Sequence, residues 1–160
     1  MSNEFQPEFE IIKHKVELAL HHLYRNDHFL ITNSTNERSI THKFSEYLQQ
    51  LFSEWHVDCE YNRRGENHPK DLPDQETSYP DIIIHKRNTI DNLLIIEAKS
   101  IHSQNHSDEA DKRKIFSFIQ DERYAYCYGL WICFFDEISE SQLDWFQNIE
   151  GSCCEVIADE

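Results

Sequence analysis

The chain has 160 residues, and a domain of this size buries roughly 70% of the surface that its unfolded chain would expose. Hydrophobic residues make up 39% of the chain and aromatic residues 12%, which excludes an intrinsically disordered protein. With 30 acidic and 15 basic residues the net charge is -15; such a surface repels phosphate, which counts against a tight, free-standing DNA-binding protein. We expect a single globular domain over residues 1–160.

No apolar segment reaches the length of a membrane span, about 18 residues, and the start "MSNEFQPEFE" lacks the basic residues and apolar run of a signal peptide. We therefore expect a cytoplasmic protein with no membrane partner. The 5 cysteines show no disulfide-framework spacing and predict reduced thiols. Cys127 and Cys133 lie in an apolar run and are expected in the core.

Two helices are predicted at the start of the chain. Apolar residues at helical spacing between Ile12 and Leu23 predict a first helix over about 8–25. A second apolar stripe begins at Ile40 and predicts a helix that ends near Ser53. Its entry, "STNE", has the pattern of a capping box that runs from Ser34 to Glu37.

Three strands should follow these helices. Alternation in "HVDCEY" predicts a strand over 57–61, and the polar stretch 62–79, with its glycine and prolines, predicts a long loop. The aliphatic runs 81–86 and 93–99 predict two strands joined as a hairpin by "RNTIDN".

The last part of the chain alternates between helices and strands. Periodicity predicts a helix over about 108–122, and "YCYGLWICFF" is apolar on both faces, as in a central strand buried between helix layers. A further helix is expected near 141–149 and a short strand near 155–157. Because a helix connects the third and fourth strands, a parallel crossover is allowed, and the predicted fold is an α/β sandwich with a mixed β-sheet flanked by α-helices.

The hairpin carries the charges that point to chemistry. Glu97 and Lys99 are two residues apart on one strand, so their side chains project to the same face and that of Ala98 to the other. Asp81 opens the neighbouring strand, and antiparallel pairing can place it beside the end of the strand that carries Glu97. Two carboxylates and an ammonium group should then converge at one edge of the sheet. The alternative is an ordinary hairpin with solvated end charges.

Such a cluster predicts a metal site. Adjacent carboxylates repel each other unless a cation lies between them, and oxygen ligands suit Mg²⁺ or Mn²⁺ better than zinc. An ion of this kind polarises a phosphodiester and lowers the pKa of a bound water, while Lys99 positions the water or offsets developing charge. The expected reaction is metal-dependent hydrolysis of phosphodiester bonds in nucleic acid.

These residues resemble the signature of the PD-(D/E)xK nuclease superfamily: Pro80-Asp81, 15 intervening residues, then Glu97-Ala98-Lys99. The resemblance covers roughly residues 37–135 and implies a restriction-endonuclease-like fold with the core order αβββαβ, preceded here by one extra helix. It implies Asp81, Glu97 and the Ala98 carbonyl as metal ligands, Lys99 as the catalytic lysine, and DNA as the expected substrate. Superfamily members often work as dimers, and a homodimer or a larger protein complex is the corresponding expectation, although no feature of this sequence fixes an interface.

The superfamily often adds a further acid on the helix before the first core strand. Glu37 falls within the apolar stripe of that helix and Glu46 points to the opposite side, so Glu37 is the candidate catalytic residue. Its alternative role is that of a capping-box glutamate that serves only the helix end.

Other residues have weaker claims. Arg63 and Arg64, in "YNRRG", form the best small basic patch for contact with phosphate. His85 could point toward the same face as Asp81. Asp111 and Lys114 flank the apolar stripe of the predicted helix over 108–122, where the superfamily sometimes adds a supporting polar residue, and their predicted form is an exposed ion pair.

Two further functions compete with the nuclease. The acidity of the chain suits a catalytically silent module with this fold that binds a protein partner in a defence or repair system. It would also suit a phosphate-mimicking inhibitor, in which Lys99 would have no purpose.

Overall fold

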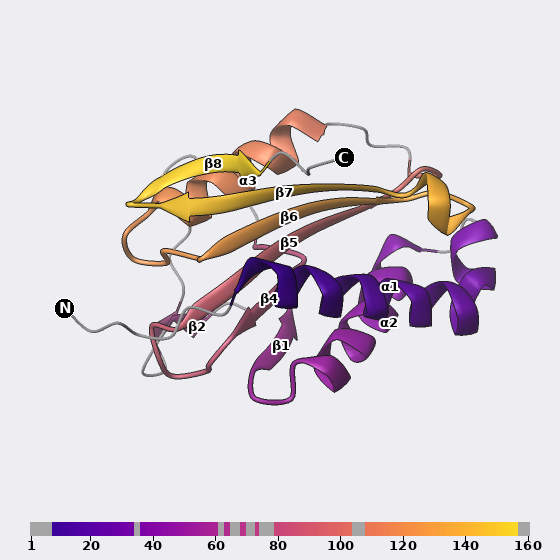
Figure 1. The fold of residues 1–160 in the computed structure, drawn as a ribbon, viewed down its shortest axis with the longest axis horizontal. Coiled ribbons are helices and arrows are strands. Elements are labelled where there is room, and N and C mark those ends of the chain that lie inside the picture. Colours follow the sequence, from indigo (N-terminus) through magenta and orange to yellow (C-terminus); the bar gives the residue numbers. More distant parts are fainter. Residues whose placement is uncertain are drawn as a thin grey trace.

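The computed structural model describes residues 8–33, 36–60, 63–64, 68–69, 73, 79–103 and 108–156. Within these ranges the fold is mixed α/β, with three α-helices packed on a six-stranded sheet (Figure 1). The sheet order is β1-β4-β5-β6-β7-β8, in which β5 and β6 are parallel and the other neighbours antiparallel. The predicted mixed sheet is confirmed.

The main sheet is made of six strands with the following bounds: β1 His56–Cys59, β4 Ile82–His85, β5 Asn92–Ser100, β6 Tyr128–Phe134, β7 Gln142–Ile149 and β8 Ser152–Val156. A separate antiparallel pair, β2 Arg63–Arg64 and β3 His68–Pro69, lies within the predicted long loop. The hairpin is confirmed, because β4 and β5 pair antiparallel with Ile82 opposite Ile96.

The first two helices are α1 Phe9–Thr32 and α2 Glu37–Leu51. The helix α1 continues past the predicted end. It is kinked at Asp27, where the backbone leaves helical geometry, and then resumes as far as Thr32. The N-cap of α2 is Asn36, whose side chain accepts a hydrogen bond from the Arg38 amide at 2.7 Å. The predicted capping box is therefore wrong; Ser34 lies outside the described residues.

Helices cover both faces of the sheet (Figure 1). The pair α1 and α2 packs on the face that presents Ile82 and Ile96, and α3, Asp108–Gln120, packs on the face that presents Ile83 and Ile95. This alternation explains the all-aliphatic hairpin strands, since both faces are buried. The approach of α3 requires Gly129 on β6, where a Cβ atom would lie 2.4 Å from Cγ2 of Ile115.

The predicted helix over 141–149 is wrong. Gln142–Ile149 form β7, which pairs with β6 and β8. Leu143, Phe146 and Ile149 are spaced three apart, as on one face of a helix. In the strand, Trp145 packs on the α1 side and Phe146 on the α3 side, so tertiary pairing overrides the local spacing.

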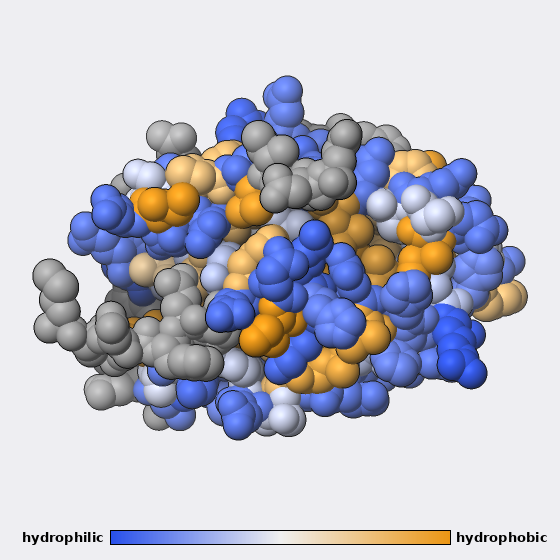
Figure 2. Space-filling view, viewed as in Figure 1, coloured by the Kyte–Doolittle hydropathy of each residue, from blue (hydrophilic) through white to orange (hydrophobic). Residues whose placement is uncertain are grey.

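The surface in Figure 2 is mainly hydrophilic, with separate apolar patches. Ile11 and Leu18 of α1 are exposed, as is Phe29 near its end. None of the helices in the described ranges combines the length and apolar character that crossing a membrane requires. The five cysteines are free thiols, with Cys127 and Cys133 only half-buried against the two core clusters.

Candidate active site

The hairpin brings the two predicted acidic ligands into contact. Asp81 immediately precedes β4, and its backbone N–H donates to Oε1 of Glu97 at 3.3 Å. The Ala98 N–H in turn donates to Oδ2 of Asp81 at 2.9 Å. Each acid is therefore held by the backbone next to the other, which fixes both carboxylates at the end of the hairpin where β4 begins.

Pro80 gives the Ala98 carbonyl a distinct environment. Continuing the register of Ile82 with Ile96 by two residue pairs places Pro80 opposite Ala98. In a strand the N–H and C=O of one residue point to the same edge, so the Ala98 carbonyl faces the edge where its N–H meets Asp81. Proline has no N–H to donate, and the Ala98 carbonyl therefore receives no ladder hydrogen bond from the opposite residue.

Glu37 reaches the same edge from α2. Its Oε2 accepts a hydrogen bond from the Ser100 N–H at 3.3 Å. Along this edge of β5 the order is the Ala98 N–H, the Ala98 carbonyl and the Ser100 N–H, so the carbonyl lies between the groups that hold Asp81 and Glu37. Glu37 is the first residue of α2 and its carboxylate serves the strand, which contradicts the capping-box alternative.

On the face of the sheet that α3 covers, Glu97 and Lys99 form ion pairs with this helix. Lys99 Nζ lies 3.4 Å from Oδ2 of Asp111, and Lys114 Nζ lies 3.0 Å from Oε1 of Glu97. Lys114 also donates to the Tyr79 carbonyl at 2.7 Å. The prediction of an exposed ion pair between Asp111 and Lys114 is wrong, because Lys114 is only 7% exposed and each residue pairs with the hairpin instead.

Burial and neighbouring charges set the pKa values of Asp81 and Glu97. Burial raises the pKa of Glu97 well above its usual value, and the adjacent Asp81 carboxylate raises it further. Burial also raises the pKa of Asp81, although the Ala98 N–H and the Lys114 ammonium act in the opposite direction. Two carboxylates that are costly to ionise together form a place where an added cation is favoured.

The donor set suits a hard divalent ion. Asp81, Glu97 and the Ala98 carbonyl offer oxygen atoms of the kind that Mg²⁺ and Mn²⁺ bind. In the described parts of the chain, no three His, Cys, Asp or Glu side chains are grouped so as to hold a metal ion. The candidate donors are therefore two carboxylates and one backbone carbonyl, with Glu37 farther along the edge.

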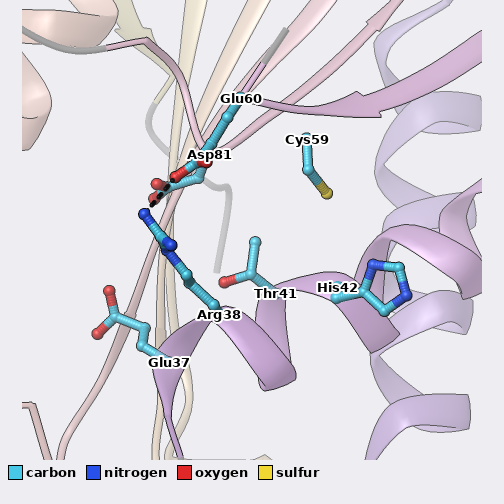
Figure 3. A pocket seen from close by; sticks show the side chains of 7 residues that line it. All are labelled: Glu37, Arg38, Thr41, His42, Cys59, Glu60 and Asp81. Carbon is cyan, nitrogen blue, oxygen red and sulfur yellow. Dashed lines mark ion pairs between the residues drawn. The ribbon is translucent and has the colours of Figure 1, made fainter.

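A pocket of about 310 Å³ opens beside Asp81 (Figure 3). The residues that line it come from α2, the end of β1 and the start of β4: Glu37, Arg38, Thr41, His42, Cys59, Glu60 and Asp81. Arg38 extends across it to pair with Glu60 at 3.5 Å, and both side chains are exposed. Asp81 and Glu37 are thus accessible to a ligand from this side, whereas Glu97 lies buried behind Asp81.

Other predicted residues lie elsewhere. His85 is buried at the opposite end of β4, where its Nε2 lies 2.7 Å from Oδ2 of Asp58. Glu46 pairs with His42 and Lys43 on the surface of α2, consistent with the choice of Glu37. The backbone of Arg63 and Arg64 forms β2, and the side chains of that predicted basic patch lie outside the described residues.

Comparison of the chain with family models, curated proteins and solved structures finds no match. The resemblance to the PD-(D/E)xK superfamily therefore rests on the motif residues. Arg38 was missed from the sequence because nothing local shows that it faces a pocket. The sequence does point to Lys114. It is a cation beside the buried apolar stripe of α3, and this helix follows the strand that carries Glu97 and Lys99.

Proposed function

We propose that the protein is a metal-dependent nuclease that hydrolyses phosphodiester bonds in nucleic acid, with DNA as the expected substrate. One observation carries this proposal: Asp81 and Glu97 are held against each other at the end of the hairpin, beside an open pocket and with Lys99 two residues from Glu97. Burial disfavours the charged form of both acids, and the Asp81 carboxylate further disfavours that of Glu97, so a bound cation would stabilise the pair.

The hairpin residues have separate tasks in this proposal. Asp81, Glu97 and the Ala98 carbonyl would hold Mg²⁺ or Mn²⁺. The bound ion would polarise the phosphodiester and lower the pKa of a bound water. Lys99 orients the attacking water or offsets the charge that develops on the phosphate oxygens. Glu37, which accepts a hydrogen bond from the Ser100 N–H of β5, orients substrate or water on the pocket side of the site.

The proposed fold class is restriction-endonuclease-like. In its support, α2, β1, β4, β5, α3 and β6 follow one another in the order αβββαβ of that core once the small pair β2 and β3 is set aside. The parallel pairing of β5 with β6 through α3 agrees with this assignment. In the same frame, α1 is the additional N-terminal helix.

Substrate must approach an acidic protein. With a net charge of -15, long-range attraction for nucleic acid is absent, so binding depends on local cations and on the metal ion. Arg38 borders the pocket and is exposed, which makes it the best placed phosphate contact among the described residues. Arg63 and Arg64 remain the other proposed contacts, and a homodimer or a larger complex would supply more.

Cleavage assays test this function. The full chain is incubated with Mg²⁺ or Mn²⁺ and labelled single- and double-stranded DNA and RNA. We expect cleavage that chelation abolishes and that Glu97→Gln and Lys99→Ala each remove. Glu46→Gln is the matched control, because it changes the same charge on the exposed side of α2. Cleavage that survives Glu97→Gln would contradict the mechanism.

A second candidate is a catalytically silent module with this fold that binds a protein partner. It is favoured by the net charge and by three acids, Glu37, Glu60 and Asp81, in one pocket. Calorimetry with Mn²⁺ separates the candidates. The nuclease should bind Mn²⁺ and lose it in Asp81→Asn, whereas a chain that neither binds Mn²⁺ nor cleaves nucleic acid supports the silent module.

A further inference from the structure

The helix α3 and the strand β5 are joined by two ion pairs of opposite polarity. The acid Asp111 of α3 faces the lysine Lys99 of β5 at 3.4 Å, and the lysine Lys114 of α3 faces the acid Glu97 of β5 at 3.0 Å. All four side chains are less than a fifth exposed. Exposed ion pairs contribute little, but buried charges need their partners, so these contacts constrain the side chains that make them.

The two pairs fit the geometry of the crossover. The helix runs antiparallel to β5, so the later residue on the helix meets the earlier residue on the strand. Three residues along a helix rise about 4.5 Å, and two residues along a strand rise about 6.6 Å. The long lysine side chains bridge the difference. As a result, one turn of α3 presents the charges that both motif residues require.

Lys114 also connects the two halves of the motif. Its ammonium group donates to the Tyr79 carbonyl, two residues before Asp81, while pairing with Glu97. The Asp81 N–H donates to the same Oε1 atom of Glu97. Oε1 of Glu97 thus has both the Lys114 ammonium and the Asp81 N–H within contact distance. On the other pair, Oδ2 of Asp111 is buried without a hydrogen-bond partner among the described residues and has the Lys99 ammonium as its ion-pair partner.

We infer that Asp111 and Lys114 are positioning residues of the site: Lys114 fixes Glu97 relative to the backbone before Asp81, and Asp111 holds the Lys99 ammonium in place. The catalytic part of this inference rests on the proposed nuclease function, whereas the pairing across α3 and β5 stands by itself. Outer partners that orient ligands typically change metal affinity or activity by about 10- to 100-fold when they are removed.

Thermal unfolding of the full chain tests the pairing without reference to activity. Lys114→Met should lower the melting temperature by about 6–12 °C, because it leaves Glu97 buried without its cation. The double variant Lys114→Met/Glu97→Gln should lose clearly less than the sum of the two single losses. Lys112→Met is the matched control on the same helix, because Lys112 pairs with Asp144, and its loss should add to that of Glu97→Gln. Additive losses for Lys114 and Glu97 would overturn the pairing.

Kinetics then test positioning. Asp111→Asn should lower kcat about 10-fold or more while KM is unchanged, and Glu109→Gln, the same charge change at an exposed position of α3, should leave kcat unchanged. Lys114→Arg should retain most of the activity that Lys114→Met loses. Wild-type kcat in Asp111→Asn would overturn its positioning role. A wild-type chain that shows the coupling but no cleavage would refute the proposed nuclease and, with it, positioning for catalysis, while leaving the pairing intact.

Discussion

The two ends of β4 carry charge clusters of opposite character. At one end Asp58 accepts contacts from His85 and Arg87, so a single acid faces two potential cations. Burial alone would raise the pKa of Asp58, but the hydrogen bonds from His85 and Arg87 outweigh it and hold the pKa well below its usual range. At the other end, the pKa values of Asp81 and Glu97 are raised.

This difference separates a structural cluster from a candidate catalytic one. The Asp58 cluster is internally neutralised and ties β1 to β4 and to the turn that follows β4. The cluster of Asp81 and Glu97 is stabilised by Lys114 and still disfavours its own charge, and we propose it as the cation site for this reason together with its geometry. Neutralising an acid should therefore affect mainly stability at the Asp58 end of β4 and mainly chemistry at the Asp81 and Glu97 end.

The largest expected effect separates the ends by activity. Glu97→Gln should reduce the cleavage rate by about 10³-fold, because it removes a charged ligand at the reacting centre. Asp58→Asn, assayed where the protein remains folded, should keep its rate within about threefold. Initial rates on one DNA substrate with Mn²⁺, with circular dichroism to verify folding, provide the measurement. Equal losses in both variants would erase the distinction.

Stability should show the reverse ranking. Asp58→Asn should lower the free energy of unfolding by about 3 kcal/mol at pH 7, because it removes the negative charge that pairs with Arg87 and with buried His85. A carboxyl with a depressed folded-state pKa contributes stability above its unfolded value, about 3.9, and loses it as the pH falls through the folded-state pKa. The difference between wild type and variant should thus shrink as the pH is lowered below about 4. Urea unfolding across this range measures it, and a gap that grows on acidification would contradict the assignment.

Backbone chemistry at the catalytic end offers a subtler change. Pro80→Ala adds an N–H opposite Ala98, which allows the ladder of β4 and β5 to extend to this residue and engage the Ala98 carbonyl. Mn²⁺ binding should weaken by about fivefold, corresponding to one competing hydrogen bond. Calorimetry gives the affinity, and an unchanged value would show that the carbonyl is no ligand.

The smallest expected change in the free energy of unfolding is that of Asp81→Asn. Asp81→Asn keeps an acceptor for the Ala98 N–H and removes a charge that repels Glu97, so the free energy of unfolding without metal should change by less than about 1 kcal/mol. The same variant should lose Mn²⁺ binding. A large loss of stability, like that expected for Asp58→Asn, would mean that both ends of β4 are structural.

Local sequence patterns were sufficient for much of this fold. The hairpin strands, α2, α3 and the buried strand β6 follow from aliphatic runs and helical spacing, because these elements bury whole stripes or both faces. The pairing of Asp81 with Glu97 also follows, because antiparallel register brings the start of one strand beside the end of the other. By contrast, the helix expected near 141–149 is wrong, because these residues become a strand through pairing with β6 and β8, which local spacing does not show.

The sequence by itself determined the motif, its hairpin and the helix that carries Glu37, since each depends on periodicity and short-range spacing. Only the tertiary structure decided which partners the charges have. Lys114 and Asp111 lie next to each other on one helix, yet they pair with Glu97 and Lys99 on β5. Ion pairing depends on distance and burial after folding, and neither can be read from the spacing of charges along the chain.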